Sequence, residues 1–147
     1  MYTQNRSPLA NFFAEYGYYF ALIVALVATL GSLYFSEVRH FDPCRLCWFQ
    51  RICMYPLVAL TLVGVIKQDE YLPNYVLPLS LIGFVISAYH IGIQNQWIVQ
   101  ASGCTGVSCS LKYVNWLGFI SIPVMAGTAF AIISVLMIMS MRLNREG

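Results

Sequence analysis

The sequence predicts an all-α membrane protein, a bundle of four transmembrane helices, from three observations. Apolar residues make up 59% of the 147-residue chain. Only 10% of the residues are charged, whereas a water-soluble domain has about 25%, and the mean hydropathy is +0.69. Aromatic residues reach 15%, as expected for a chain with many positions at bilayer interfaces. Each crossing needs roughly 20 apolar residues, so we expect one integral membrane domain over residues 1–147.

The first span is expected at residues 16–36, between the charges of Glu15 and Glu37. Its apolar part is longer than the hydrophobic region of a typical signal peptide, and no typical cleavage site accompanies it. We therefore interpret this segment as a retained helix.

The second span is expected at residues 48–66, where the charged KQDE segment closes it. Arg51 falls inside this span, near its starting end. A charged side chain within a span is costly, so it marks a candidate functional site by default.

The third and fourth spans are expected at residues 73–93 and 116–141. A single helix cannot hold the long uncharged stretch before Lys112, and the polar segment after Ile93 provides the division. Two loops, 37–47 and 94–115, then lie on the same side of the membrane. Both termini lie on the other side with the short loop after the second span.

Positive charge does not decide the orientation, because the positive-inside rule compares equal numbers of cations here. The side of the termini has Arg6, Lys67, Arg142 and Arg145, and the side of the two loops has Arg39, Arg45, Arg51 and Lys112. The cysteines are more informative, since disulfides persist outside the plasma membrane while cytosolic thiols stay reduced. We therefore expect cytoplasmic termini and extracytoplasmic loops. The net charge of +2 gives no clustered basic face for a nucleic-acid partner.

Four of the five cysteines lie in the two loops that share a side. Cys44 and Cys47 form a C-x-x-C motif where the first loop meets the second span, and Cys104 and Cys109 form a C-x-x-x-x-C motif in the second loop. By spacing alone they could be redox-active, could staple the helices as structural disulfides, or could bind zinc through four thiolates. Cys53 has apolar neighbours, so we expect it in the core.

Helical spacing places Arg51 on the same stripe as Cys44 and Cys47, at positions i, i+3 and i+7 of a helix that begins near Cys44. A guanidinium there would stabilise a thiolate and donate hydrogen bonds to an oxygen-bearing ligand. His90 lies near the outward end of the third span. It is either hydrogen-bonded to a neighbouring carbonyl group or a donor to a bound redox ligand.

These features together resemble a known family. The features that carry the resemblance are the segment PCRLCWFQR from Pro43 to Arg51, the second cysteine pair, the YHIG segment at His90, and a last span that contains Pro123. They are similar to the DsbB family of quinone-dependent thiol oxidases, most closely to its short Gram-positive-type branch, BdbC. The resemblance covers nearly the whole chain.

The resemblance implies a multi-pass protein of the bacterial plasma membrane with extracytoplasmic redox loops. Such a protein reoxidises a thioredoxin-like partner of the DsbA or BdbD type. It passes the electrons to a membrane quinone, either menaquinone or ubiquinone, and through the quinone pool to the respiratory chain. The product is disulfide bonds in secreted proteins.

The resemblance also assigns roles to individual residues. The partner's thiolate would attack Cys104 and release Cys109, which would then exchange with Cys44. Cys47 would be the thiolate next to the quinone, with Arg51 stabilising it. His90 matches a further quinone-proximal position, and no metal ligand is assigned.

One departure from the family pattern concerns the second pair. Only residues 105–108 separate its cysteines, whereas the Gram-negative enzymes have a long loop there. A tight ring is expected to be strained and therefore more oxidising. Two alternatives stay open. One is a reductase of the vitamin K epoxide reductase type, whose C-x-x-C comes late in the chain instead of early. The other is a non-enzymatic membrane protein with a four-cysteine metal site or a purely structural role.

Overall fold

The computed structural model describes residues 8–40, 42–99 and 121–146. Within these ranges the regular structure is helical and contains no strand. The elements are α1 (Pro8–Leu33), its π-helical continuation η1 (Tyr34–Val38), α2 (Arg45–Lys67), α3 (Leu72–Gln94) and α4 (Ile122–Glu146). Four helical segments are long and apolar enough to cross a membrane, Tyr16–Val38, Arg45–Lys67, Leu72–Gln94 and Ile122–Arg145. The predicted fold class, an all-α protein with four membrane-spanning helices, is confirmed.

The helices continue past the charged residues that delimit the apolar stretches. α2 begins at Arg45, and α4 runs on to Glu146. Backbone hydrogen bonds sustain a helix regardless of side-chain charge, so hydropathy marks where a helix can lie in lipid but not where it ends.

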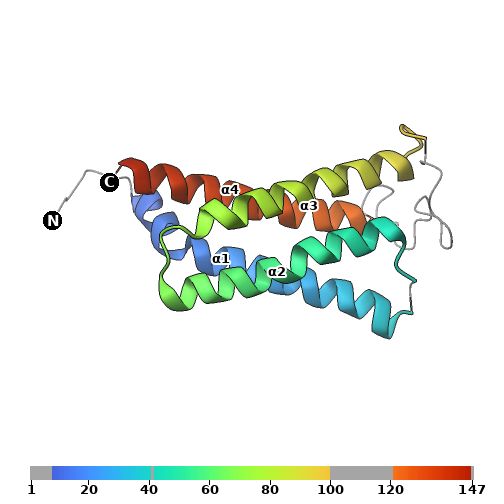
Figure 1. The fold of residues 1–147 in the computed structure, drawn as a ribbon, viewed down its shortest axis with the longest axis horizontal. Coiled ribbons are helices and arrows are strands. Elements are labelled where there is room, and N and C mark those ends of the chain that lie inside the picture. The colour runs from blue at the N-terminus through green and yellow to red at the C-terminus, as the bar shows by residue number, and fades with distance from the viewer. Residues whose placement is uncertain (1–7, 41, 100–120, 147) are drawn as a thin grey trace.

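The four helices run alternately up and down in sequence order (Figure 1). Each packs on two neighbours, so that α1 contacts α2 and α4, and α3 also contacts α2 and α4. The turn between α2 and α3 lies at the same end of the bundle as the start of α1 and the end of α4. The opposite end holds η1, the start of α2 and the end of α3, and we call it the cysteine end because Cys44 and Cys47 lie there.

The core forms where apolar side chains from all four helices meet. Its largest fully buried members include Leu57 on α2, Leu72 on α3, and Phe130 and Met137 on α4. On α1 the buried residues are small, such as Ala21, which lets the helix backbone approach its neighbours closely. The outward faces carry many exposed large apolar side chains, the surface that a lipid-embedded bundle presents to acyl chains.

Hydroxyl groups link the helices inside the bundle. The Ser80 and Ser134 hydroxyl oxygens lie 2.8 Å apart between α3 and α4, and the Ser140 hydroxyl donates to the Tyr18 hydroxyl at 3.1 Å between α4 and α1. Such bonds contribute about 0.6–2 kcal/mol each between helices in a membrane. They fix the register of α4 against its two neighbours.

The turn between α2 and α3 closes by local hydrogen bonds. Gln68 adopts a left-handed conformation with φ of 52°, and its backbone N–H donates to the carbonyl oxygen of Gly64. The Asp69 carboxylate accepts from the Tyr75 hydroxyl and, at 2.9 Å, from the Tyr71 backbone N–H. These two donors hold the pKa of Asp69 below its usual range.

We predict that Gly83→Ala destabilises the protein by about 1–3 kcal/mol. A Cβ at Gly83 would collide with the ring of Phe130, which is fully buried in the apolar core. Gly17→Ala is the matched control, because nothing lies within 4 Å of the added Cβ there. Thermal unfolding in detergent should show a lower midpoint for the first variant only. Equal midpoints would contradict the close packing of α3 on α4.

Candidate functional site

A cavity of about 360 Å³ opens between the helices toward the cysteine end. Apolar side chains of α1 and α4 form much of its wall. Polar groups gather on the side formed by α2 and α3, and they include Cys44, Cys47, Gln50, Arg51 and His90. The structure therefore brings four of the sequence-predicted site residues, Cys44, Cys47, Arg51 and His90, to the lining of one cavity.

The first cysteine pair lies at the N-terminus of α2. Cys44 is the N-cap residue with extended backbone angles, and its carbonyl oxygen accepts the first helical hydrogen bond from Trp48 at 3.1 Å. Cys47 lies in the first turn, three residues on, so the two side chains share a face. Neither is in a disulfide, and the Cys44 thiol donates to the Cys47 sulfur with the two Sγ atoms 3.3 Å apart.

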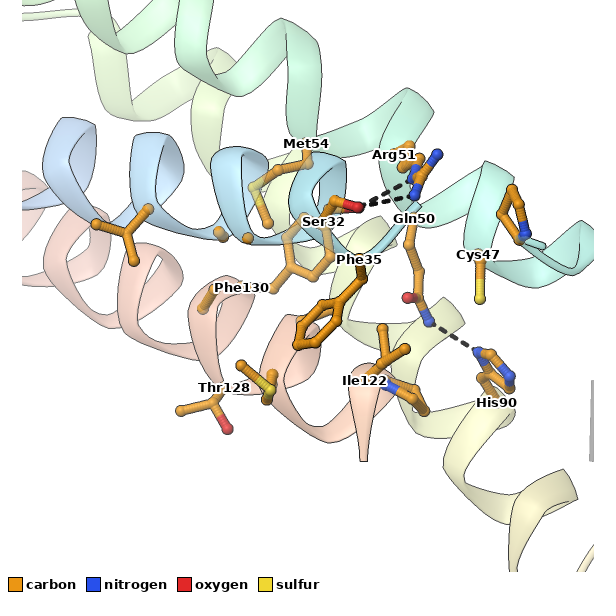
Figure 2. A pocket seen from close by; sticks show the side chains of 18 of the residues that line it. Ser32, Phe35, Cys47, Gln50, Arg51, Met54, His90, Ile122, Thr128 and Phe130 are labelled. Carbon is orange, nitrogen blue, oxygen red and sulfur yellow. Dashed lines mark hydrogen bonds between the residues drawn. The ribbon is translucent and has the colours of Figure 1, made fainter. Parts of the chain in front are cut away.

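His90 connects this pair to α3. Its Nε2 lies 3.6 Å from the Cys44 sulfur, and its Nδ1 lies 3.3 Å from Nε2 of Gln50. All three side chains are buried, with exposed fractions of 1% for His90 and 5% each for Gln50 and Cys44. Figure 2 shows Gln50 reaching from α2 toward His90. With the Gln50 amide as donor, Nδ1 accepts and Nε2 carries the proton that faces the sulfur.

The environment of Cys44 favours the protonated thiol and raises its pKa to about 11. The hydrogen bond that it donates to Cys47 is the largest cause, and burial is the second. The interaction with His90 acts in the opposite direction. Since the thiolate is the nucleophile in thiol chemistry, Cys44 in this arrangement holds its proton at neutral pH.

Arg51 lies on the cavity side of α2 and is held by α1. Its Nε donates to the Ser32 hydroxyl at 2.9 Å, and its terminal nitrogen donates to the Ser32 carbonyl oxygen at 3.0 Å (Figure 2). The guanidinium carbon also lies 5.7 Å from the centre of the Trp48 ring, within cation–π range. Arg51 therefore joins α1 to α2 beside the cysteine pair.

Two site residues, Gln50 and Ser32, were not found from the sequence. Gln50 lies three residues after Cys47, so the spacing that singled out Arg51 also places Gln50 on the cysteine face. An uncharged polar residue in a span gives a weaker signal than an arginine, and the partner of Gln50 is 40 residues away in the chain. Ser32 resembles any small residue of a transmembrane helix.

The remaining cysteines fall into two groups. Cys53 is buried in the main apolar core, as expected. Cys104 and Cys109 lie outside the described residues, and their expected roles remain predictions.

Comparisons with known proteins agree on one family. The model of the family described as "Disulfide bond formation protein DsbB" matches residues 15–140. "Probable disulfide formation protein C" of Halalkalibacterium halodurans is 47% identical over 82% of this chain and 89% of its own length. "Disulfide bond formation protein C" of Bacillus subtilis is 47% identical over 81% of this chain and 88% of its own. A "Probable disulfide formation protein" of Coxiella burnetii is 40% identical over 86% of this chain and 88% of its own length. No solved structure matches significantly.

We predict that Cys44 in the reduced protein reacts with iodoacetamide at pH 8 about 100-fold more slowly than it does after unfolding. A thiol with a pKa of about 11 is almost fully protonated at that pH, whereas an ordinary cysteine, with a pKa near 8.5, is partly ionised. Mass spectrometry of the alkylated peptide measures the rate across a pH series.

Two variants test the causes of this shift. Cys47→Ala should lower the apparent pKa of Cys44, because it removes the hydrogen bond that contributes most. His90→Ala should raise it, because the histidine interaction favours the thiolate. A Cys44 that reacts equally fast in the folded and the unfolded protein would contradict the prediction.

Proposed function

The chain belongs to the DsbB family of disulfide bond formation proteins, and from this premise we propose that it is a quinone-dependent membrane thiol oxidase. Membership supports the role in disulfide bond formation and the oxidoreductase class. We infer further that its partner is a reduced thioredoxin-like protein of the DsbA or BdbD type and that its electron acceptor is a membrane quinone. The observation that carries the proposal is a pair of cysteine sulfurs 3.3 Å apart, lining an apolar cavity among membrane-spanning helices.

The cavity suits a lipid-soluble acceptor with a flat ring and polar ends. Its walls are largely apolar, and a guanidinium and an imidazole lie on the same side as the thiols. Arg51, His90 and Cys47 are the residues that would hold a quinone there. A bound quinone would supply a two-electron, two-proton acceptor that is soluble in the lipid bilayer.

The chain's own residues would perform the thiol chemistry in four successive exchanges. The partner's thiolate attacks the Cys104–Cys109 disulfide, and Cys109 then attacks Cys44 of the Cys44–Cys47 disulfide. The partner's second thiolate then attacks its own sulfur in the bond to Cys104, and the released Cys104 attacks Cys109 and frees Cys44. Each exchange breaks one S–S bond and forms another, so after all four the partner's dithiol is oxidised and the first pair of this chain is reduced. Cys47 leaves as a thiolate, and the neighbouring helix N-terminus of α2 favours that negative charge.

The position of the site in the bundle supports an orientation. Cys44 and Cys47 lie at the end opposite the α2–α3 turn and the helical ends nearest the termini (Figure 1). Since the partner is extracytoplasmic in this proposal, the cysteine end faces outward and the termini face the cytoplasm. The protein then belongs in the bacterial plasma membrane with its redox loops outside.

The alternatives can be separated from the oxidase. The family match favours the oxidase over a reductase of the vitamin K epoxide reductase type, in agreement with the early position of the C-x-x-C motif. A non-enzymatic four-cysteine metal protein would be isolated with one equivalent of zinc and four thiolates. Metal analysis and thiol titration of the purified protein distinguish these cases.

The direct test mixes the purified protein, a reduced DsbA-type partner and a soluble quinone without oxygen. We expect one quinol to form for each partner disulfide produced. Partner oxidation without quinol formation would overturn the quinone as acceptor. No oxidation of the partner would overturn the proposal as a whole.

We predict that serine substitution of any one of the four loop cysteines abolishes catalytic turnover. Each of Cys44, Cys47, Cys104 and Cys109 contributes one sulfur to a disulfide that must form and break in every cycle. Cys53→Ser is the control and should retain most activity, because Cys53 lies in the apolar core. Partner oxidation followed by thiol titration measures the effect. Full activity of Cys104→Ser or Cys44→Ser would refute the assigned roles.

We predict that Arg51→Ala raises the apparent KM for quinone by about tenfold or more, because a hydrogen bond to a charged group contributes about 1.5–3 kcal/mol. Ser32→Ala should cause a smaller rise, since the Ser32 carbonyl oxygen still holds one donor of the guanidinium. Arg51→Lys keeps the charge and should lie between wild type and Arg51→Ala. Steady-state kinetics at varied quinone provides the measurement, and an unchanged KM in all three variants would remove Arg51 from the quinone site.

A further inference from the structure

We propose that the reduced site binds one zinc ion through Cys44, Cys47 and His90. The ligating atoms of these three residues all lie within 4.8 Å of one another. This binding goes beyond the proposed oxidase, which uses no metal. It also differs from the four-cysteine site considered from the sequence, because it needs one cysteine pair and a histidine from α3.

The distances between the ligand atoms agree with a tetrahedral ion. Zinc–sulfur bonds of about 2.3 Å and a zinc–nitrogen bond of about 2.0–2.1 Å place two sulfurs about 3.8 Å apart and a sulfur and a nitrogen about 3.5 Å apart. The observed separations are 3.3 Å between the two sulfurs and 3.6 Å between the Cys44 sulfur and His90 Nε2. The sulfur pair has to open by a small change of side-chain torsion in Cys47, which is the less buried of the two. The same change would adjust the distance from the Cys47 sulfur to His90 Nε2, which lies within 4.8 Å.

The surroundings provide the support that a metal-bound histidine needs. Such a histidine usually donates its second ring N–H to an oxygen acceptor. Gln50 already contacts Nδ1 of His90 at 3.3 Å, and a half-turn of its terminal amide presents the carbonyl oxygen to that nitrogen. Gln50 is itself buried, so its side chain holds the imidazole in one orientation.

Charge balance favours a divalent ion at this place. Two thiolates in a buried, low-dielectric position repel each other, and zinc neutralises both charges when the two thiol protons leave to solvent. Thiolate and imidazole ligands together select zinc over magnesium or calcium, which prefer oxygen. Three protein ligands leave a fourth position open toward the cavity.

Zinc binding would depend on the redox state of the pair. The Cys44–Cys47 disulfide has no thiolates to offer, so only the dithiol binds the ion. Once bound, neither sulfur is available for disulfide exchange. Zinc at the site would therefore hold the protein in its reduced state and inhibit its turnover.

The test uses the full chain with Cys104→Ser and Cys109→Ser. The first pair then supplies the reactive thiols, and the one other cysteine is the buried Cys53. The protein is reduced anaerobically, freed of reductant and titrated with zinc against a chromophoric chelator. We expect one equivalent of zinc on the reduced protein and none after oxidation of the pair. Cobalt substitution should give the sulfur-to-metal absorption and the intense visible bands of a tetrahedral site.

Single variants identify the ligands. His90→Ala should weaken zinc binding at least tenfold. Gln50→Leu should weaken it about tenfold, since loss of an outer-shell partner costs 10–100-fold in affinity. Cys53→Ser is the matched control and should bind as tightly as its parent. Thermal unfolding of each metal-free protein shows whether a variant has kept the fold, and Gln50→Leu keeps the test decisive if His90→Ala has not.

Two results would overturn the proposal. One is zinc affinity that is unchanged in both His90→Ala and Gln50→Leu, and the other is equal binding to the reduced and the oxidised protein. Neither result bears on the oxidase, because partner oxidation is measured separately in the wild-type chain without added zinc. Conversely, a wild-type chain that lacked oxidase activity could still bind zinc in this titration.

Discussion

The site depends on a chain of side-chain contacts, from Gln50 through His90 to Cys44 and Cys47, in which all but Cys47 are buried. A polar group inside a membrane bundle has no water to form hydrogen bonds with, so its hydrogen-bond partners must come from the protein's own helices. This requirement fixes the end of α3 against the start of α2. It also sets the orientation of the imidazole at the first cysteine. The same contacts place the sulfurs in the lining of a largely apolar cavity.

Arg51 imposes a second constraint, where α2 meets α1. Its two hydrogen bonds to Ser32 use the side chain and the backbone of one residue, so α1 and α2 are held together next to the cysteines. A charge within the bundle is tolerated because these acceptors and the Trp48 ring replace part of its hydration. Farther from the cysteine end the helices pack through apolar side chains and short hydroxyl contacts, such as the Ser80–Ser134 pair. The polar chemistry is therefore concentrated where the apolar packing leaves a cavity.

Patterns local in sequence predicted much of this arrangement. Hydropathy identified four spans because each crossing needs a long apolar segment, and it did so without knowledge of how the helices pack. The i, i+3, i+7 spacing placed Arg51 with Cys44 and Cys47 because those residues share one helix. Helix ends were less predictable, since charged residues mark the edge of a span and not the end of a helix. His90 was recognised as a candidate, but its two possible roles could not be separated by spacing.

By itself, the sequence determined the all-α class, the four spans, and the cysteine, arginine and histidine positions that resemble the DsbB family. These properties follow from composition and from spacing within single helices. Tertiary structure alone decided which groups meet across helices: Gln50 with His90, His90 with Cys44, and Arg51 with Ser32. The physical reason is that a hydrogen bond between helices depends on rotation and register, which the packing of apolar side chains from the whole bundle sets together. No local pattern encodes that result.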